Sequence, residues 1–275
     1  MSYTLTLTLT LAACFGLQSF ALHRSGGKTN KSESNFFSSL ARIQTGIRSQ
    51  PEVMLLGSSI TGRLPDRSSG FAGVANLGCD GSSAADTLEA MDAGRLPIAP
   101  KLIIEGNTLY RSASGATSEI GRAIASPWFQ VGNQIPNLGA TARPAAFAYS
   151  RLLAGKIGLS PGPVGEALPC RSLPHVAVEA QDLPAAADPW VSKLAALLKR
   201  LEARGCQCLL VIIPPGANGN SLNIRIPREL SRRSQVPLLD LTDGLPPGAV
   251  LLTDGVHLAP QSAAETLRAI LKNFP

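Results

Sequence analysis

Aromatic residues are scarce in this chain of 275 residues, at 5% of the sequence. Its Lys and Arg residues are scattered along the chain and form no basic block. Proteins that bind single-stranded nucleic acid combine a basic groove with aromatic side chains on which bases stack, so this composition argues against a nucleic-acid partner. The sequence also lacks internal repeats and long runs of one charge, which argues against a repeat array and a disordered protein.

Hydrophobic residues make up 44% of the sequence, which is enough for a chain of this length to bury one full core. We therefore expect a single folded domain. The formal charge of +6 suits an anionic surface or polymer as a partner.

The five cysteines do not decide the compartment. If Cys14 lies in a removed or lipidated segment, four remain, and an even number permits disulfides outside the cytosol. No pairing follows from the sequence. Cys206 and Cys208 should point to one face of a strand, where packing in the core is favoured over metal binding because no His-rich motif accompanies them.

The N-terminal segment is almost free of charge over residues 3–22 and is followed by basic residues and a linker rich in Ser, Asn and Gly. About twenty apolar residues are just enough to cross a bilayer. Ser19-Phe20-Ala21 would serve as the cleavage site of a signal peptide, and Leu11-Ala12-Ala13-Cys14 resembles a bacterial lipobox. Against export, the basic residues follow the apolar segment instead of preceding it.

We nevertheless interpret residues 1–34 as a signal or anchor segment with a linker, and residues 35–275 as the folded domain. The segment before about Asn35 should then make no contact with the domain. The protein is expected to be exported to the periplasm or outside the cell, or to be anchored to the membrane through residues 3–22.

Only three histidines occur in the chain, and one of them has an acid at a useful spacing. His23 lies beside the apolar segment and His175 lies in a Pro-rich stretch, whereas Asp254 stands three residues before His257. A carboxylate at this spacing can reach the Nδ1–H of the imidazole. That contact fixes the tautomer and leaves Nε2 free to deprotonate a hydroxyl.

The candidate nucleophile lies upstream, where the short apolar run of residues 53–56 ends at Gly57-Ser58-Ser59. Such a run is typical of a buried strand, and open α/β sheets place their sites at the carboxyl ends of strands. A Ser after Gly is more often the N-cap of a helix, so this motif alone identifies no nucleophile. Cys79 is a weaker candidate, because it would have to face His257 in place of the serine.

Two further loops follow strand-like runs and should reach the same edge of the sheet. One contains Asn76-Leu77-Gly78 and the other contains Glu105-Gly106-Asn107-Thr108. A glycine N–H and an Asn amide are neutral donors that can be held rigidly toward the oxyanion of an acyl-transfer reaction. An ordinary turn glycine and an Asn cap are the alternative explanations of these residues.

These motifs occur in the order of the four sequence blocks of the SGNH (GDSL-type) hydrolases, and the chain from about Val53 to its C-terminus resembles that family. The resemblance implies that Ser59 is the nucleophile, that His257 is the base and that Asp254 orients it. It implies an oxyanion hole formed by Ser59, Gly78 and Asn107. It also implies a flavodoxin-like α/β fold and a serine esterase or O-acyltransferase that acts on ester-linked acyl groups and needs no metal and no other cofactor.

The chain departs from the family pattern at two acidic positions. The usual Gly-Asp-Ser has become Gly57-Ser58-Ser59, and the usual Gly-x-Asn-Asp has become Glu105-Gly106-Asn107-Thr108. Of the two serines, we choose Ser59 because Ile60-Thr61 continues the family register. Similar Gly-Ser-Ser forms occur in members outside the cytoplasm that act on cell-envelope polysaccharides, so the resemblance implies an acylated polysaccharide or small molecule as substrate. The alternative is a non-catalytic carbohydrate-binding or assembly protein on a degenerate SGNH scaffold.

The remaining pattern predicts a three-layer α/β/α sandwich with a mainly parallel sheet. Ala84, Leu88 and Met91 recur at helical spacing after the Gly78 loop, with Ser82 or Ser83 as the N-cap. We expect a loop-rich insertion at about 111–188, over the active-site edge. The later part of the chain alternates between helices at residues 190–204 and 259–271 and strands at residues 208–213 and 237–241.

Overall fold

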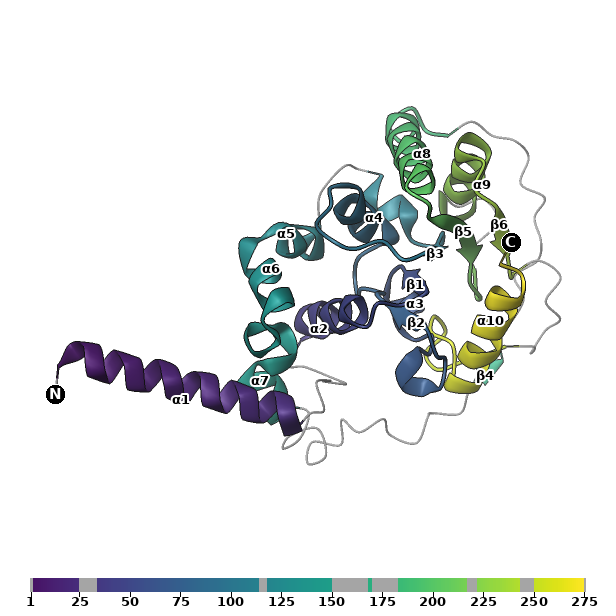
Figure 1. The fold of residues 1–275 in the computed structure, drawn as a ribbon. Coiled ribbons are helices and arrows are strands. Elements are labelled where there is room, and N and C mark those ends of the chain that lie inside the picture. Colours follow the sequence, from purple (N-terminus) through teal and green to yellow (C-terminus); the bar gives the residue numbers. More distant parts are fainter. Residues whose placement is uncertain are drawn as a thin grey trace.

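A parallel sheet of five strands forms the centre of the protein (Figure 1). The computed structural model describes residues 2–24, 34–113, 118–149, 168–169, 183–216, 222–242 and 250–274. Each neighbouring pair in the sheet is parallel, so the predicted α/β class with a mainly parallel sheet is confirmed. In spatial order the strands are β2 (Val74–Asn76), β1 (Val53–Leu56), β3 (Lys101–Glu105), β5 (Gln207–Ile212) and β6 (Leu238–Asp240).

Apolar layers cover both faces of this sheet. Successive side chains of a strand point to opposite faces, so Met54 and Leu56 lie in one apolar layer, whereas Val53 and Leu55 lie in the other. The first layer includes residues of α2 (Asn35–Arg48), α4 (Ala84–Asp92), α8 (Asp188–Ala203) and α9 (Leu222–Ser234). The second includes residues of α10 (Pro260–Lys272).

The remaining elements are short, apart from the N-terminal helix. β4 (Leu168–Pro169) and β7 (Leu251–Leu252) form a small antiparallel pair. The other helices are α1 (Tyr3–Arg24), α3 (Ser59–Gly62), α5 (Glu119–Ala125), α6 (Pro127–Gln134) and α7 (Pro144–Phe147). Helices α5, α6 and α7 lie in the predicted insertion at 111–188, most of whose second half lies outside the described residues.

The strand order reverses beside β1. From β1 the chain continues to β2 on one side, and it then returns to β3 on the other side of β1. Ligands of open α/β sheets bind at the carboxyl ends of strands where the order reverses. In this protein that point lies between the end of β1, which is followed by Gly57-Ser58-Ser59, and the end of β3, which is followed by Gly106-Asn107.

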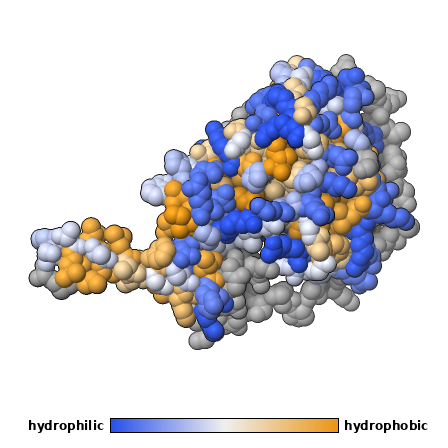
Figure 2. Space-filling view, in the orientation of Figure 1, coloured by the Kyte–Doolittle hydropathy of each residue, from blue (hydrophilic) through white to orange (hydrophobic). Residues whose placement is uncertain are grey.

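Helix α1 is long and apolar enough to cross a membrane, by length and composition. Its N-terminal part projects from the domain and presents an apolar surface (Figures 1 and 2). Its C-terminal end packs against the domain, since Ala21 is buried and the Asn137 side chain donates a hydrogen bond to Ser19 Oγ. The expectation that the segment before about Asn35 makes no contact with the domain is therefore wrong, because the sequence of a helix does not show where its end docks.

Candidate active site

Ser59, His257 and Asp254 come together after the carboxyl end of β1, although the histidine is 198 positions after the serine in the sequence. Ser59 is the first residue of α3, and His257 lies in the loop between β7 and α10. The His257 Nε2 atom is 2.9 Å from Ser59 Oγ, and its Nδ1 atom is 2.6 Å from Asp254 Oδ2. The acid and the serine thus contact opposite nitrogens of one imidazole, which is the arrangement that the Asp-x-x-His spacing predicts.

The turn from Asp254 to His257 fixes the carboxylate. Asp254 Oδ1 accepts hydrogen bonds from the backbone N–H groups of Val256, at 3.1 Å, and His257, at 2.8 Å. Gly255 has a φ of +80°, which favours glycine at this point of the turn. Burial acts to raise the pKa of Asp254, but the hydrogen bonds from His257 and Val256 outweigh it and lower that pKa to about 2. Asp254 is therefore ionised at neutral pH, and its negative charge faces the imidazole.

The two serines after Gly57 have different roles in the structure. Ser58 is 1% exposed and caps α3, since its Oγ accepts a hydrogen bond from the Ile60 N–H at 3.1 Å. The same hydroxyl donates to the carboxylate of Glu105. Ser59 is half-buried and directs its hydroxyl to His257. The geometry therefore favours Ser59 over Ser58 as the reactive hydroxyl.

Glu105 is a buried carboxylate directly beneath this turn. It is 1% exposed, and its Oε2 accepts hydrogen bonds from the backbone N–H groups of Ser58, at 2.9 Å, and Thr61, at 3.1 Å. The hydroxyls of Thr61 and Thr108 donate to it as well, at 2.6 and 2.8 Å. A Cβ on Gly57 would overlap this carboxylate, so the glycine is needed for the approach. Glu105 thus holds α3 at its N-cap, Ser58, and at its third residue, Thr61.

Sequence reasoning missed this function of Glu105. It counted the motif only as a site where the family's acid has been lost. A carboxylate that ends an otherwise apolar, buried strand cannot remain without partners, because an unpaired buried charge is very costly. That signal would have predicted a cluster of donors around Glu105.

Asn107 is anchored to the end of β5. Its Nδ2 donates to the Ile213 carbonyl and its Oδ1 accepts from the Ile213 N–H, both at 2.8 Å. The side-chain amide has two N–H groups, and this pairing uses one of them. Within the described residues this amide makes no other hydrogen bond, and the side chain is 3% exposed.

The structure corrects the prediction for Gly78. Its N–H donates to Asn76 Oδ1 at 2.9 Å, and the residue is buried against Gly62, where a Cβ would overlap the backbone. Asn76 also donates to the carbonyls of Thr61 and Leu64, at 2.7 Å each. Gly78 and Asn76 therefore pack against and hold the segment that follows Ser59, and the Gly78 N–H is already engaged.

Two other backbone N–H groups, that of Ser59 itself and one in the Gly78 loop, are candidates for oxyanion donors. Ser59 occupies the first position of α3, where a helical N–H has no partner in the helix. Gly81 is exposed and has a φ of +78°. It lies two residues after Cys79, whose N–H donates a hydrogen bond to the Gly57 carbonyl at 2.8 Å. Among the described residues, neither the Ser59 N–H nor the Gly81 N–H has an acceptor.

Cys79 is unsuited to nucleophilic attack. It is completely buried, and burial raises the pKa of its thiol to about 12. The thiolate is the nucleophilic form of cysteine, and at neutral pH this side chain is almost entirely protonated. Cys206 and Cys208 are also buried free thiols, whereas Cys170 lies outside the described residues.

Within the ranges that the structure describes, no group of three or more His, Cys, Asp or Glu side chains could hold a metal ion. Comparisons of the chain with protein-family models, curated proteins and solved structures find no match. The geometry of the site is therefore the basis on which its chemistry is assigned.

Proposed function

We propose that the protein is a serine esterase or O-acyltransferase of the SGNH (GDSL-type) hydrolase kind, built on a three-layer α/β/α sandwich. The observation that carries the proposal is the continuous contact from Ser59 Oγ through the two nitrogens of His257 to Asp254, at 2.9 and 2.6 Å. A hydroxyl, an imidazole and a carboxylate in this order activate a serine by removing its proton as it attacks.

In the proposed reaction, His257 Nε2 takes the proton of Ser59 while Oγ forms a bond to the carbonyl carbon of an ester. The ionised Asp254 stabilises the imidazolium that results. The imidazolium then gives its proton to the leaving alcohol as the ester C–O bond breaks, which leaves an acyl group on Ser59. Water or a sugar hydroxyl then attacks the acyl carbonyl as His257 removes its proton. The imidazolium returns that proton to Ser59 Oγ as the bond between Oγ and the acyl carbon breaks, which restores the serine.

We assign the oxyanion hole to the Ser59 N–H, the second amide N–H of Asn107 and the Gly81 N–H. Support for Asn107 comes from its fixed position, because both polar atoms of its side chain are held by Ile213. Support for Gly81 comes from its exposure and its unengaged N–H in the same loop as Gly78. Rigid neutral donors of this kind stabilise the developing negative charge at little reorganisation cost.

The proposed location is the outer side of a membrane, with residues 3–22 as an anchor. Support comes from the apolar helix α1 and from its docking through Ser19 and Ala21, which favours a helix that is retained. The natural substrate is proposed to be an ester-linked acyl group on a cell-envelope glycan. A non-catalytic binding protein is disfavoured, since binding alone does not require an aligned serine, histidine and acid.

Turnover of a simple ester tests the proposal. Purified protein should hydrolyse p-nitrophenyl acetate, because an activated serine attacks a reactive ester whatever its natural acceptor is. Ser59→Ala should abolish turnover. Ser58→Ala, which removes the neighbouring hydroxyl but not the reactive one, should retain measurable activity. The reverse result for the two serines would overturn the assignment, and folded wild-type protein without turnover would favour the non-catalytic alternative.

A further inference from the structure

A cavity of about 560 Å³ lies beside the C-terminal end of α3, the short helix that begins with Ser59. Helix α2, the segment of residues 62–71, the edge strand β2 and α10 line it. Gly62, the last residue of α3, and Pro260, the first residue of α10, belong to its wall, whereas Ser59 and His257 do not. Ser59 and Gly62 are separated by about 4.5 Å along the helix axis. The cavity is therefore adjacent to the candidate catalytic residues and distinct from them.

The lining is strongly basic. Arg42 comes from α2, Arg63 and Arg67 come from the segment after α3, and Arg268 comes from α10. Among the described residues of the lining, Asp66 is the one acidic side chain, so four positive charges and one negative charge leave a net charge of +3 on them. The Asp66 carboxylate is already occupied, because its Oδ1 accepts from the Ser68 N–H at 2.7 Å and from the Ser68 hydroxyl at 2.6 Å.

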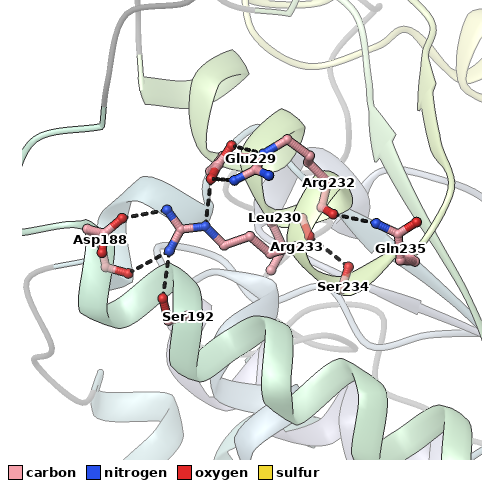
Figure 3. Close-up of polar contacts among 8 residues, drawn as sticks. All are labelled: Asp188, Ser192, Glu229, Leu230, Arg232, Arg233, Ser234 and Gln235. Atoms are coloured by element: carbon pink, nitrogen blue, oxygen red, sulfur yellow. Dashed lines mark hydrogen bonds and ion pairs between the residues drawn. The ribbon is translucent and has the colours of Figure 1, made fainter.

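These four arginines differ in their contacts from arginines of α9 that form ion pairs. Arg232 and Arg233 of α9 bind Glu229, and Arg233 also binds Asp188 at the start of α8 (Figure 3). The cavity arginines form no ion pair with any residue of the described ranges. Instead, Arg42 donates a hydrogen bond to the Gly78 carbonyl, and the Arg268 guanidinium lies 5.7 Å from the centre of the Phe71 ring. Arg63, Arg67 and Arg268 thus carry charges that no ion pair among the described residues neutralises, whereas the Asp80 carboxylate lies near Arg42 beside Gly62.

We propose that this cavity binds the anionic groups of an acidic oligosaccharide and selects it as the substrate whose acyl ester reaches Ser59. The inference rests on the proposed function. Guanidinium groups form paired, charge-assisted hydrogen bonds with carboxylates and phosphates, which makes arginine the preferred residue for such groups. A volume of about 560 Å³ is typical of small-ligand sites. The hydroxyls of Thr45 and Ser69 in the lining add partners for sugar hydroxyls.

Arg42 links this cavity to the catalytic loops. Its guanidinium holds the Gly78 carbonyl, and a Cβ on Gly62 would overlap it. It therefore lies between the turn of α3 and the Gly78 loop. An anion bound by Arg42 would be held next to the turn that carries Ser59, so a sugar ring with an acid group in the cavity would place a neighbouring acylated hydroxyl near the reactive serine.

Binding to the full-length Ser59→Ala protein in detergent tests this inference without turnover. The probe is oligogalacturonate of about six sugars, compared by calorimetry with its fully methyl-esterified form, which has the same sugars without the charge. The acidic probe should bind, and more weakly as salt is raised. Adding Arg63→Gln and Arg67→Gln, which change exposed side chains, should raise its Kd at least about tenfold. The matched control is Arg95→Gln with Lys272→Gln, two exposed residues outside the cavity, and should change the Kd by less than about twofold.

Three results of the comparison between probes and variants would overturn the inference, and a fourth would come from a phosphate polymer. The three are no binding of the acidic probe, equal binding of the esterified probe, and an equal loss of affinity in the control, which would indicate unspecific attraction to a basic protein. Inorganic polyphosphate that binds more tightly than the oligosaccharide would show that a phosphate polymer, not a glycan, is the ligand. Serine activation is measured separately on p-nitrophenyl acetate, so failure here leaves the esterase proposal standing.

Discussion

Glu105 shows at the scale of single residues how a buried acidic side chain can support a reactive group that it does not touch. Its carboxylate accepts hydrogen bonds from Ser58, the residue before Ser59, and from Thr61, two positions after Ser59. The backbone at Ser59 is thereby held from both sides, and the hydroxyl is directed to His257. We describe Glu105 as a positioning residue, since it acts through the turn.

Replacement of Glu105 tests this role. Glu105→Ala should lower kcat on p-nitrophenyl acetate at least about tenfold and destabilise the fold by about 1–3 kcal/mol, because buried N–H groups lose their acceptor. Glu105→Gln should restore part of the activity, since its carbonyl can still accept from the backbone of the turn. Glu52→Gln, an exposed acid before β1, is the control. Wild-type kcat in a folded Glu105→Ala protein would contradict the role.

Asn107 combines a structural contact with a proposed catalytic one. Asn107→Ala should lower turnover about 10²–10³-fold, the usual effect of losing one oxyanion donor. The melting temperature should also fall, because Ile213 loses partners for both its N–H and its carbonyl. Kinetics recorded well below that temperature separate the two effects. Unchanged turnover in the folded variant would remove Asn107 from the oxyanion hole.

At the scale of elements, the sequence predicted those with strong local patterns. The buried runs of β1, β3 and β5 and the amphipathic helices α4, α8 and α10 were expected close to their observed bounds, whereas residues 74–76 of β2 were assigned to the loop that contains Gly78. Helix α9 was not expected, because Pro227 lies inside it and proline usually interrupts a helix. Its apolar face against α8 and β5, which includes Ile226 and Leu230, compensates for that cost through packing that no local pattern reveals.

In the candidate site, too, contacts between residues close in sequence could be predicted, whereas those that depend on distant residues could not. Residues 254–257 formed a local signal, so the contact between His257 and Asp254 could be predicted from spacing alone. The different functions of Ser58 and Ser59 depend on Glu105, which is 47 positions from Ser58. The engagement of the Gly78 N–H depends on the rotamer of Asn76, which the sequence does not specify.

The ion-pair cluster between α8 and α9 makes stability depend on pH (Figure 3). The hydrogen bond from Arg232 has the largest effect on the pKa of Glu229 and lowers it. Burial acts to raise this pKa, but a second hydrogen bond, from Arg233, lowers it further, and the pKa falls from 4.5 to about 2. The folded state therefore gains stability from this group above pH 4.5, and the gain is lost as pH falls toward 2. Glu229→Gln should cost about 1 kcal/mol at pH 7 and much less at pH 2.5, measured by denaturant unfolding. An equal cost at both values would contradict the assigned shift.

On the scale of the whole molecule, α1 joins a membrane-length apolar helix to the domain through a short contact at its C-terminal end. The core of the domain contains few residues of this helix, since Ala21 is the one buried apolar side chain within it. The apolar layers on the sheet are formed by later elements. The domain should therefore fold without the anchor.

Deletion of the residues before Lys31 tests this separation. The full chain should sediment with membranes and resist a salt wash, whereas the truncated protein should be soluble and keep one cooperative thermal transition. A small decrease in melting temperature is expected from the loss of the Ser19 and Ala21 contacts. Loss of the cooperative transition would show that α1 belongs to the core.

The most direct test of the account is covalent labelling of the purified protein with a fluorophosphonate, followed by mass spectrometry of its peptides. An activated serine reacts with this probe irrespective of its natural substrate. We expect the label on Ser59, with loss of labelling in Ser59→Ala and strong reduction in His257→Ala, which lacks the base. Labelling of another residue, or labelling that persists in Ser59→Ala, would contradict the claim that Ser59 is the nucleophile.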